Sequence, residues 1–328
     1  MKKIITIIIS ACLMALGCFG LAACGNNNQN KNDKLSVVCT IFPEYDWVSE
    51  ILGENKDNVE LTLLLDNGVD LHSYQPSVQD IAKISTCDLF IYVGGESDAW
   101  VDNALKNATN KNMKVINLLE VLGDKVKTEE TVEGMEHEHE HSHEDEKEND
   151  EHVWLSLKNA EILCKKITSE LSALDKDNAA TYENNFAAYK QKLTALDKDY
   201  SSAVKNAKYK TLVFGDRFPF RYLVDDYNLK YYAAFAGCSA ETEASFETIV
   251  FLAGKVDELS LPAVCTIEGR EHKIAETVRN NTTTKNQKIL TFDSMQSTTS
   301  KDVKNGVTYL SVMEKNLKVL KEALGVNA

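Results

Sequence analysis

Several signatures of common enzymes and scaffolds are missing from this 328-residue chain. Outside one histidine tract described below, it contains no HExxH, and it contains no CxxC pair and no GxSxG. A zinc finger, a zincin and a hydrolase of the nucleophile-elbow type are therefore not indicated. A basic stripe is also missing, and the formal net charge is −14. Binding to nucleic acid is disfavoured, because no cluster of Lys and Arg is present to displace counterions from phosphates.

Cysteine is scarce in the part of the chain that is expected to fold. Three of the eight cysteines lie within the first 24 residues. The other five are Cys39, Cys87, Cys164, Cys238 and Cys265. Their odd number and wide spacing argue against a disulfide-stapled scaffold, so most are expected to be small buried residues. A single bridge between Cys238 and Cys265 is left open as an alternative.

The first residues have the composition of a secretory signal. Lys2 and Lys3 precede an apolar run that ends in Leu-Ala-Ala-Cys, with Cys24 as its last residue. We expect a signal peptide over 1–23, lipidation of Cys24, and a tether over 24–34 that anchors the protein to the membrane. A transmembrane helix is the alternative, which the polar residues after Cys24 disfavour. No second apolar stretch of spanning length follows, so the remainder is expected to be soluble.

Negative charge is concentrated in one segment. Residues 129–151 hold twelve Asp or Glu and one Lys, a net charge of −11, which leaves −3 for the rest of the chain. Few apolar residues are available there to offset the entropy of ordering, so a disordered loop is predicted over 124–151. The loop contains a tract of alternating acids and imidazoles with the histidines His137, His139, His141 and His143. We interpret them as an auxiliary metal-binding loop, with a solvated acidic linker as the alternative.

From residue 35 onward, short β-rich runs alternate with amphipathic helical runs, which is the pattern of an α/β fold. Four strands are expected in each half of the chain. They are 36–41, 59–65, 88–93, 114–118, 211–215, 229–235, 262–267 and 288–292. Helical periodicity over 156–173 and 178–207 predicts two helices between the halves, the second of which is long enough to run along a domain.

These patterns predict two lobes of about four βα units each, over 35–155 and 208–328. Linker helices over 156–207 join them, and a last helix over 301–324 closes the chain. The length supports this division, because it exceeds what one hydrophobic core usually organises. Open α/β sheets bind ligands beyond the carboxyl ends of their strands, so we expect the functional site in the cleft between the lobes.

Four potential metal ligands follow predicted strands or precede the linker. They are His72, His152, Asp216 and Asp293. Each has a simpler interpretation, because a histidine is often a solvated loop residue and an Asp after a strand often caps the next helix. Together they would form a nitrogen and oxygen site that suits borderline divalent ions such as zinc or manganese.

At this point the chain resembles a known family, the zinc and manganese class of ABC-transporter substrate-binding lipoproteins. The resemblance covers nearly all of the chain after the signal. It rests on Val-Val-Cys-Thr-Ile-Phe-Pro-Glu-Tyr-Asp-Trp-Val at 37–48, the loop around His72, Cys-Asp-Leu-Phe-Ile-Tyr-Val-Gly-Gly at 87–95, Asp-Glu-His-Val-Trp-Leu at 150–155, and the start of the second linker helix. Each stretch alone is a weak indication of the family, whereas all of them in this order are a specific one.

The resemblance implies a set of ligands. In that family the metal is held by a histidine after the second strand, a histidine before the linker helices, a histidine or glutamate that opens the second lobe, and an acidic residue after its last strand. His72, His152 and Asp293 fall on three of these positions.

The remaining position departs from the family pattern. Counting from the strand end gives Asp216, whereas counting back from Tyr227 gives Arg217, and a guanidinium cannot bind a cation. We choose Asp216, which assumes one inserted residue before Phe218. Glu268, also at a strand end, is the reserve carboxylate.

The resemblance gives two opposed indications of the metal. Family members with three histidines are typically zinc proteins, whereas two histidines with two carboxylates resemble the manganese members. The histidine tract, in contrast, is typical of zinc members. Zn2+ is therefore the first choice and Mn2+ the second.

The sequence thus predicts the substrate-binding component of an ABC importer. It would capture Zn2+ and deliver it to the membrane permease as a lipid-anchored monomer on the extracytoplasmic face of a bacterial cell membrane, and it would not be an enzyme. The manganese-binding component of the same class is one alternative. A surface adhesin and a secreted metallohydrolase are alternatives from other classes.

Overall fold

The computed structural model describes residues 34–135, 148–239, 243–269 and 271–326. Leu35–Ala328 form one compact unit. The expected signal peptide over 1–23, Cys24, and the histidines of the tract at 137–143 lie outside the described residues. In the described part, no helix has both the length and the apolar character needed to cross a membrane.

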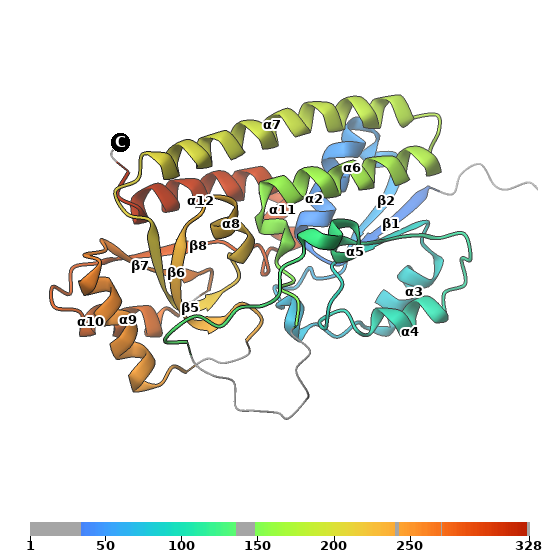
Figure 1. Ribbon diagram of the computed structural model, residues 1–328. Coiled ribbons are helices and arrows are strands. Elements are labelled where there is room, and N and C mark those ends of the chain that lie inside the picture. The colour runs from blue at the N-terminus through green and yellow to red at the C-terminus, as the bar shows by residue number, and fades with distance from the viewer. Residues whose placement is uncertain (1–33, 136–147, 240–242, 270, 327–328) are drawn as a thin grey trace, which may run out of the picture. The chain divides into compact units, whose positions relative to one another are not determined.

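The first lobe is built on a four-stranded parallel sheet in the order β2-β1-β3-β4 (Figure 1). Its strands are β1 (Leu35–Cys39), β2 (Val59–Leu63), β3 (Leu89–Tyr92) and β4 (Lys114–Asn117). Its helices are α2 (Phe42–Leu52), α3 (Val78–Thr86), α4 (Val101–Lys106) and α5 (Leu118–Leu122), with short 3-10 turns η1 (Gly53–Asn58), η2 (Leu71–Ser73) and η3 (Gly123–Lys125). All four residues of β3 are buried, as expected for a parallel strand covered on both faces.

The second lobe repeats this arrangement with the strand order β6-β5-β7-β8, again all parallel. Its strands are β5 (Thr211–Phe218), β6 (Lys230–Ala236), β7 (Ala263–Ile267) and β8 (Lys288–Phe292). Its helices are α8 (Arg221–Asp226), α9 (Phe246–Glu258), α10 (Lys273–Asn281), α11 (Ser300–Lys304) and α12 (Tyr309–Ala323). The predicted fold of two four-stranded α/β lobes is confirmed.

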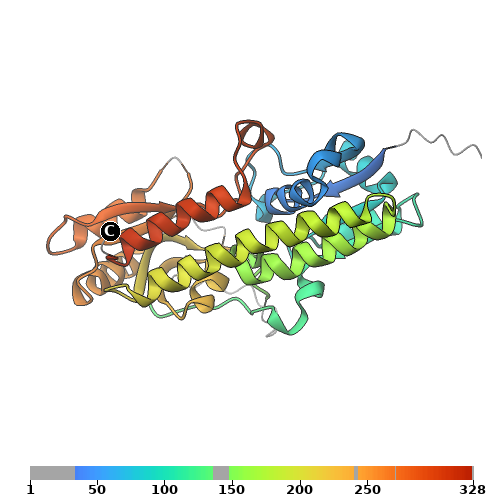
Figure 2. The ribbon, with the colours of Figure 1, turned by 90° about the horizontal axis from the view of Figure 1, so that it is seen from above.

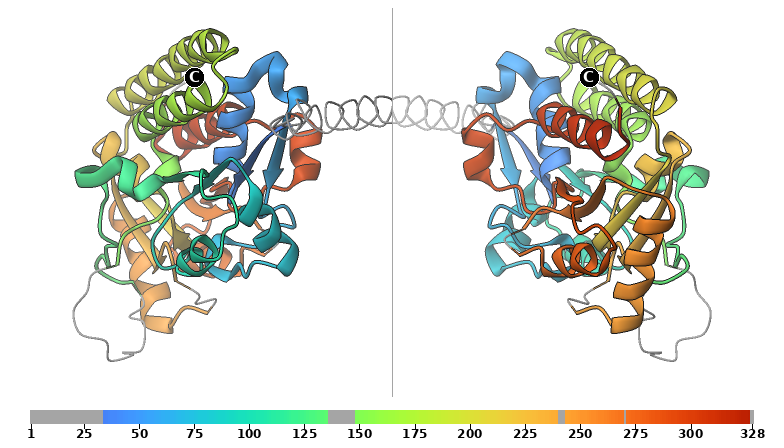
Figure 3. Two further views of the ribbon diagram at one scale, coloured as in Figure 1. Left: turned by 90° about the vertical axis from the view of Figure 1, so that its right-hand side faces the viewer. Right: turned by 90° about the vertical axis from the view of Figure 1, so that its left-hand side faces the viewer.

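Two long helices connect the lobes. They are α6 (Leu157–Leu174), which follows the turn η4 (Val153–Leu155), and α7 (Ala179–Lys205). Along its 27 residues α7 packs against α6, against α2 of the first lobe and against α12 of the second (Figure 2). The end-on views of Figure 3 place α6 and α7 together on one side of the sheets.

Buried polar contacts also tie the lobes together. The Tyr309 backbone N–H donates to Asp46 of α2 at 2.9 Å, and the Tyr309 hydroxyl donates to the Trp154 carbonyl at 2.7 Å. The Trp154 indole N–H donates to the Ser294 carbonyl at 2.9 Å. Because these groups are buried, each broken contact would leave an unpaired polar atom, which favours a fixed relation between the lobes.

The C-terminal helical segment differs from the expectation of one helix over 301–324. The chain forms α11 and α12 with a break between them, where Gly306 has a φ of +88° that few other residues adopt. Thr308 then caps α12 by accepting a hydrogen bond from the Ser311 N–H. A glycine followed closely by a capping threonine is a stop and start signal that a continuous apolar periodicity conceals.

The five cysteines after residue 34 are all free thiols. The alternative of a bridge between Cys238 and Cys265 is therefore wrong. Cys265 is fully enclosed in β7, whereas Cys238 lies in the turn after β6 and is partly exposed. Cys39, Cys87 and Cys164 are buried, as expected of small apolar residues.

Both ends of the segment expected as a loop over 124–151 are described, and they pair with each other. Thr128 and Asn149 form an antiparallel bridge, the Glu129 N–H donates to the Glu148 carbonyl, and the Asp150 N–H donates to the Lys127 carbonyl. The Lys127 N–H also donates to the Tyr222 hydroxyl of the second lobe at 3.0 Å. The base of the loop is thus held against α8.

Three carboxyl groups, those of Glu44, Asp46 and Asp98, are buried within the first lobe. Burial raises the pKa of Glu44 to about 8, aided by the nearby charge of Asp98, and burial likewise raises the pKa of Asp46 and of Asp98 to about 7. One Glu44 oxygen accepts from the Thr40 and Ile41 N–H groups, and the other has no hydrogen-bond partner among the described residues. These groups are therefore protonated in the folded protein at neutral pH or just below it.

A raised pKa in the folded state makes stability depend on pH. In the unfolded chain these carboxyls ionise near pH 4. The free energy of unfolding that they contribute is therefore complete below pH 4, and it is lost as the pH rises from there through their folded-state pKa values of about 7 to 8. Each ionising group removes up to about 1.4 kcal/mol of unfolding free energy per pH unit within that window.

We expect a lower free energy of unfolding at pH 9 than at pH 6, measured by urea denaturation. Glu44→Gln should flatten this slope; an unchanged slope in that variant would contradict the assignment.

Candidate metal site

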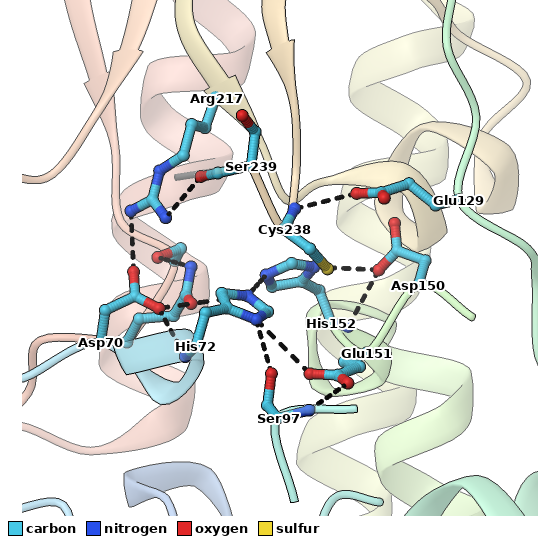
Figure 4. A network of polar contacts seen from close by, with 12 residues as sticks. Asp70, His72, Ser97, Glu129, Asp150, Glu151, His152, Arg217, Cys238 and Ser239 are labelled. Carbon is cyan, nitrogen blue, oxygen red and sulfur yellow. Dashed lines mark hydrogen bonds and ion pairs between the residues drawn. The ribbon is translucent and has the colours of Figure 1, made fainter. Parts of the chain in front are cut away.

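Three side chains with metal-binding atoms converge where the lobes meet. They are His72, His152 and Cys238, whose ligand atoms all lie within 4.8 Å of one another (Figure 4). The Nε2 atoms of the two histidines are 3.2 Å apart. Cys238 was not among the metal ligands expected from the sequence, because a lone cysteine gives no local signal of such a role.

His72 reaches the site from the loop that follows β2. It lies in η2, which begins because the Asp70 carboxylate accepts a hydrogen bond from the His72 N–H at 3.0 Å. The Nδ1 atom of its ring is 2.7 Å from the Ser97 hydroxyl and 3.5 Å from a Glu151 carboxylate oxygen. Glu151 in turn accepts from the Ser97 N–H at 3.0 Å. These contacts fix the ring so that Nε2 points into the site.

His152 is completely buried and directly precedes η4. One oxygen of Asp150 lies 2.9 Å from both its backbone nitrogen and its Nδ1 atom. The ring also packs against Trp154, with 5.3 Å between the ring centroids. A carboxylate on one ring nitrogen of a histidine holds the proton there and leaves the other nitrogen free to bind a metal, which is the usual arrangement around metal-ligating histidines.

When both imidazoles are neutral, these contacts favour tautomers whose Nε2 lone pairs face each other. If the Nδ1 atoms carry the protons that face Asp150 and Ser97, both Nε2 atoms are bare acceptors at 3.2 Å. Two acceptors so close repel each other unless a cation lies between them. Zn–N bonds of about 2.0–2.1 Å at a tetrahedral angle would separate two nitrogens by about 3.3 Å. The observed spacing fits a shared transition-metal ion.

Electrostatics oppose protonation of both rings at once. Burial lowers the pKa of His72 to about 3, and the nearby His152 lowers it further. Burial also acts to lower the pKa of His152, but Asp150 and Glu151 outweigh it and raise that pKa above its ordinary value. Since the two rings disfavour each other's charge, at most one carries an extra proton near neutral pH.

Cys238 enters the site from the turn after β6. Its backbone N–H donates to Glu129, at the base of the acidic loop, at 2.9 Å. The neighbouring Gly237 allows a close approach, because a Cβ there would lie 2.9 Å from the Phe218 carbonyl and 3.1 Å from Cε1 of His152. Burial raises the pKa of the Cys238 thiol, as do Glu129 and Asp150, so without a metal ion it is protonated at neutral pH.

An ion pair joins the lobes beside this group. Arg217 of β5 donates to Asp70 at 2.7 Å and to the Ser239 carbonyl at 3.3 Å (Figure 4). Asp70 also caps the turn that carries His72, so the second lobe helps to hold the His72 loop. A cavity of about 850 Å³ borders these residues and is lined by Asp70 and Ser73 of the first lobe and by Asp216, Arg217 and His272 of the second, among others.

Asp216 does not join the histidines. Its Oδ2 accepts from the Thr266 hydroxyl at 2.5 Å and from the Ile267 N–H at 3.3 Å, so it faces β7. The reason is a β-bulge. Between Phe214 and Arg217, β5 has one residue more than β6, and such an insertion redirects the side chains that follow. With this bulge Asp216 faces β7, whereas Arg217 reaches Asp70 in the loop that carries His72.

Asp293 is also not part of this group, and it does not take the alternative role of capping the next helix, because Thr299 is the N-cap of α11. Its carboxylate accepts from the Met295 N–H at 2.8 Å, which closes the turn after β8. The reserve residue Glu268 accepts from the N–H and the hydroxyl of Ser294. Burial raises the pKa of both carboxyls. Neither belongs to the group that His72, His152 and Cys238 form.

A two-lobed α/β protein that gathers metal-binding side chains beyond the carboxyl ends of its strands, where the lobes meet, has the design of a solute-binding protein. The chain belongs to the family described as zinc-uptake complex component A, periplasmic, whose profile matches residues 37–323. This match covers both lobes and the linker helices.

Individual relatives agree with that membership. The zinc-binding lipoprotein AdcA of Streptococcus pneumoniae serotype 4 is 34% identical over 329 residues, which is 98% of this chain and 61% of that protein. The high-affinity zinc uptake system protein ZnuA of Bacillus subtilis is 32% identical over 328 residues, 98% of this chain and 97% of that protein. The chain thus spans about three-fifths of the pneumococcal relative and nearly all of the Bacillus one.

A solved structure extends the agreement to three dimensions. The Zn(II)-bound ZnuA-like domain of Streptococcus pneumoniae AdcA matches with a TM-score of 0.69 and 31% sequence identity, over 89% of this chain and 99% of that domain. The sequence resemblance to the zinc and manganese class of substrate-binding lipoproteins is therefore confirmed at the level of family and fold.

Asp150→Asn tests how much the site depends on the orientation of His152. The amide accepts hydrogen bonds less strongly than the carboxylate and can offer an N–H to Nδ1, which favours the wrong tautomer. We expect the affinity for a divalent transition metal to fall about 10–100-fold with the fold intact, measured by competition with a chelator. Asp175→Asn, at the turn before α7, is the matched control. Equal affinities in the two variants would contradict this role of Asp150.

Proposed function

We propose that this chain is the extracytoplasmic binding component of an ABC importer, which captures Zn2+ with His72 and His152 and delivers it to a membrane permease. The observation that carries the proposal is the pair of Nε2 atoms 3.2 Å apart, each oriented by a polar partner on its other ring nitrogen. Membership of a zinc-uptake family and the printed names of the relatives support the same cargo.

Zinc is proposed over manganese for a chemical reason. The expectation of manganese depended on two carboxylate ligands, Asp216 and Asp293, and both carboxylates have other hydrogen-bond partners. Imidazole suits zinc, whereas carboxylate and water suit manganese. No catalytic role is part of the proposal, which assigns the site to reversible capture by a monomer.

The histidine tract fits this function as a collector of metal. Its base is adjacent to the site, because Glu129 accepts from the Cys238 N–H and because Asp150, Glu151 and His152 follow the loop directly. The described residues that flank the tract thus lie beside the site. We propose that the tract raises the local concentration of zinc rather than forming the high-affinity site.

Membrane attachment completes the proposal. Lipidation of Cys24 would hold the chain at the outer face of the cell membrane, where the permease is within reach. The name of the pneumococcal relative as a lipoprotein supports this location.

The histidine pair is tested by His72→Ala and His152→Ala. Both are made in a full-length background in which His137, His139, His141 and His143 are Asn, so that the tract cannot mask the result. We expect one Zn2+ per chain in the background and a loss of affinity of more than about 100-fold in either variant, since a ligand matters more than its oriented partner. Calorimetric titration measures this. His272→Ala, at the residue before α10 in the second lobe, is the control; tight binding that survives both substitutions would reject the site.

Metal preference is tested by titrating the same background with Zn2+ in the presence of excess Mn2+. We expect manganese to compete poorly, because imidazole suits zinc better than manganese and the nearby carboxylates of Asp70, Asp150 and Glu151 contact Arg217 or the Nδ1 atoms of the histidines. Elemental analysis of the protein after dialysis gives the bound metal. Retention of manganese at a comparable level would instead assign the chain to manganese import.

A further inference from the structure

We propose that Cys238 is the third protein ligand of this site and binds the metal ion as a thiolate, so that the second lobe contributes sulfur to an ion held by two histidines of the first. The inference rests on the proposed function and specifies its coordination chemistry. It also assigns a role to the one cysteine of the described chain that is not fully buried.

The three ligand atoms are close enough for one ion to gather them. The Cys238 sulfur and one ring nitrogen from each histidine all lie within 4.8 Å of one another. In a tetrahedral zinc site, Zn–S of about 2.3 Å and Zn–N of about 2.0–2.1 Å place sulfur about 3.6 Å from each nitrogen. Binding one ion therefore requires side-chain movements of up to about 1 Å.

The surroundings favour the thiol over the oxygen groups nearby. Asp150 and Glu151 contact the Nδ1 atoms of the histidines, Asp70 pairs with Arg217, and Asp216 faces Thr266. Arg217 itself has no lone pair to offer. Among the described histidine, cysteine, aspartate and glutamate side chains, the group that can share an ion is limited to His72, His152 and Cys238.

The position of Cys238 is also well defined by its neighbours. Its N–H is anchored by Glu129, and Gly237 leaves room for the His152 ring, so the turn after β6 presents the sulfur to the histidines. A cysteine that served only to fill space would not need this approach. Cys39, Cys87, Cys164 and Cys265 are each enclosed by the core and form no such group in the described part.

Zinc binding at this site changes bonds and protonation but not oxidation state. Two Zn–N bonds and one Zn–S bond form, the thiol proton passes to water, and no electron is transferred. The fourth tetrahedral position stays available for water or a further oxygen atom. A soft thiolate strengthens the preference for zinc over manganese beyond what two imidazoles provide. The site also spans both lobes, so that binding the ion couples the turn after β6 to the His72 loop.

The test uses Co2+ as a spectroscopic probe for zinc, in the full-length background without the histidine tract. A cobalt–thiolate bond gives a near-ultraviolet charge-transfer band that nitrogen and oxygen ligands do not. We expect this band in the background and in the control Cys265→Ala, and its absence in Cys238→Ser. Zinc affinity should fall more than about 100-fold in Cys238→Ser and remain unchanged in Cys265→Ala.

Three results are distinguishable. Tight zinc binding that needs His72 but shows no charge-transfer band and no loss in Cys238→Ser overturns the thiolate ligand and leaves the proposed function intact. Zinc binding that needs neither histidine overturns the proposed function itself. If Cys238→Ser fails to fold by circular dichroism, Cys238→His decides: retained zinc affinity without the band supports the ligand, and a band that persists in this variant refutes it.

Discussion

The arrangement of the site depends on two imidazole Nε2 atoms held 3.2 Å apart. Asp150 fixes one ring and Ser97 with Glu151 fixes the other, so both rings keep this spacing. When both rings are neutral and carry their protons on Nδ1, their Nε2 lone pairs repel each other, and a cation between them converts this contact into a stabilising one. Because the surrounding structure holds both rings, the histidines are already in place when the ion arrives.

The rest of the molecule can be understood as the support for that contact. Each sheet brings a loop from the carboxyl end of a strand to the junction, β2 delivering His72 and β6 delivering Cys238. The long helices α6 and α7, with the buried contacts of Tyr309 and Trp154, resist large movements of one lobe against the other. The site then adjusts through movements of its loops. The Asp70–Arg217 ion pair joins the His72 loop to the second lobe, so it can couple these movements.

The base of the acidic loop adds a feature to this design. Glu129 anchors the turn that holds Cys238, while Asp150 and Glu151, at the other end of the loop, orient the histidines. The two ends of the acidic loop therefore contact the metal-binding residues of both lobes. Strong negative charge next to a cation site also raises the local concentration of cations, and salt screens this effect.

The sequence alone determined the two four-stranded lobes, the linker helices and the family, and it singled out the two histidines that the structure brings together, because hydrophobic periodicity and local motifs encode these features residue by residue. The other side chains around these histidines could not be predicted from it. A one-residue bulge in β5 sends Asp216 to Thr266 and Arg217 to Asp70, a local hydrogen bond commits Asp293 to its own turn, and Cys238 reaches the histidines from a different lobe. Which side chains meet across a junction depends on bulges and on the packing of whole lobes, and these are decided only in the tertiary structure.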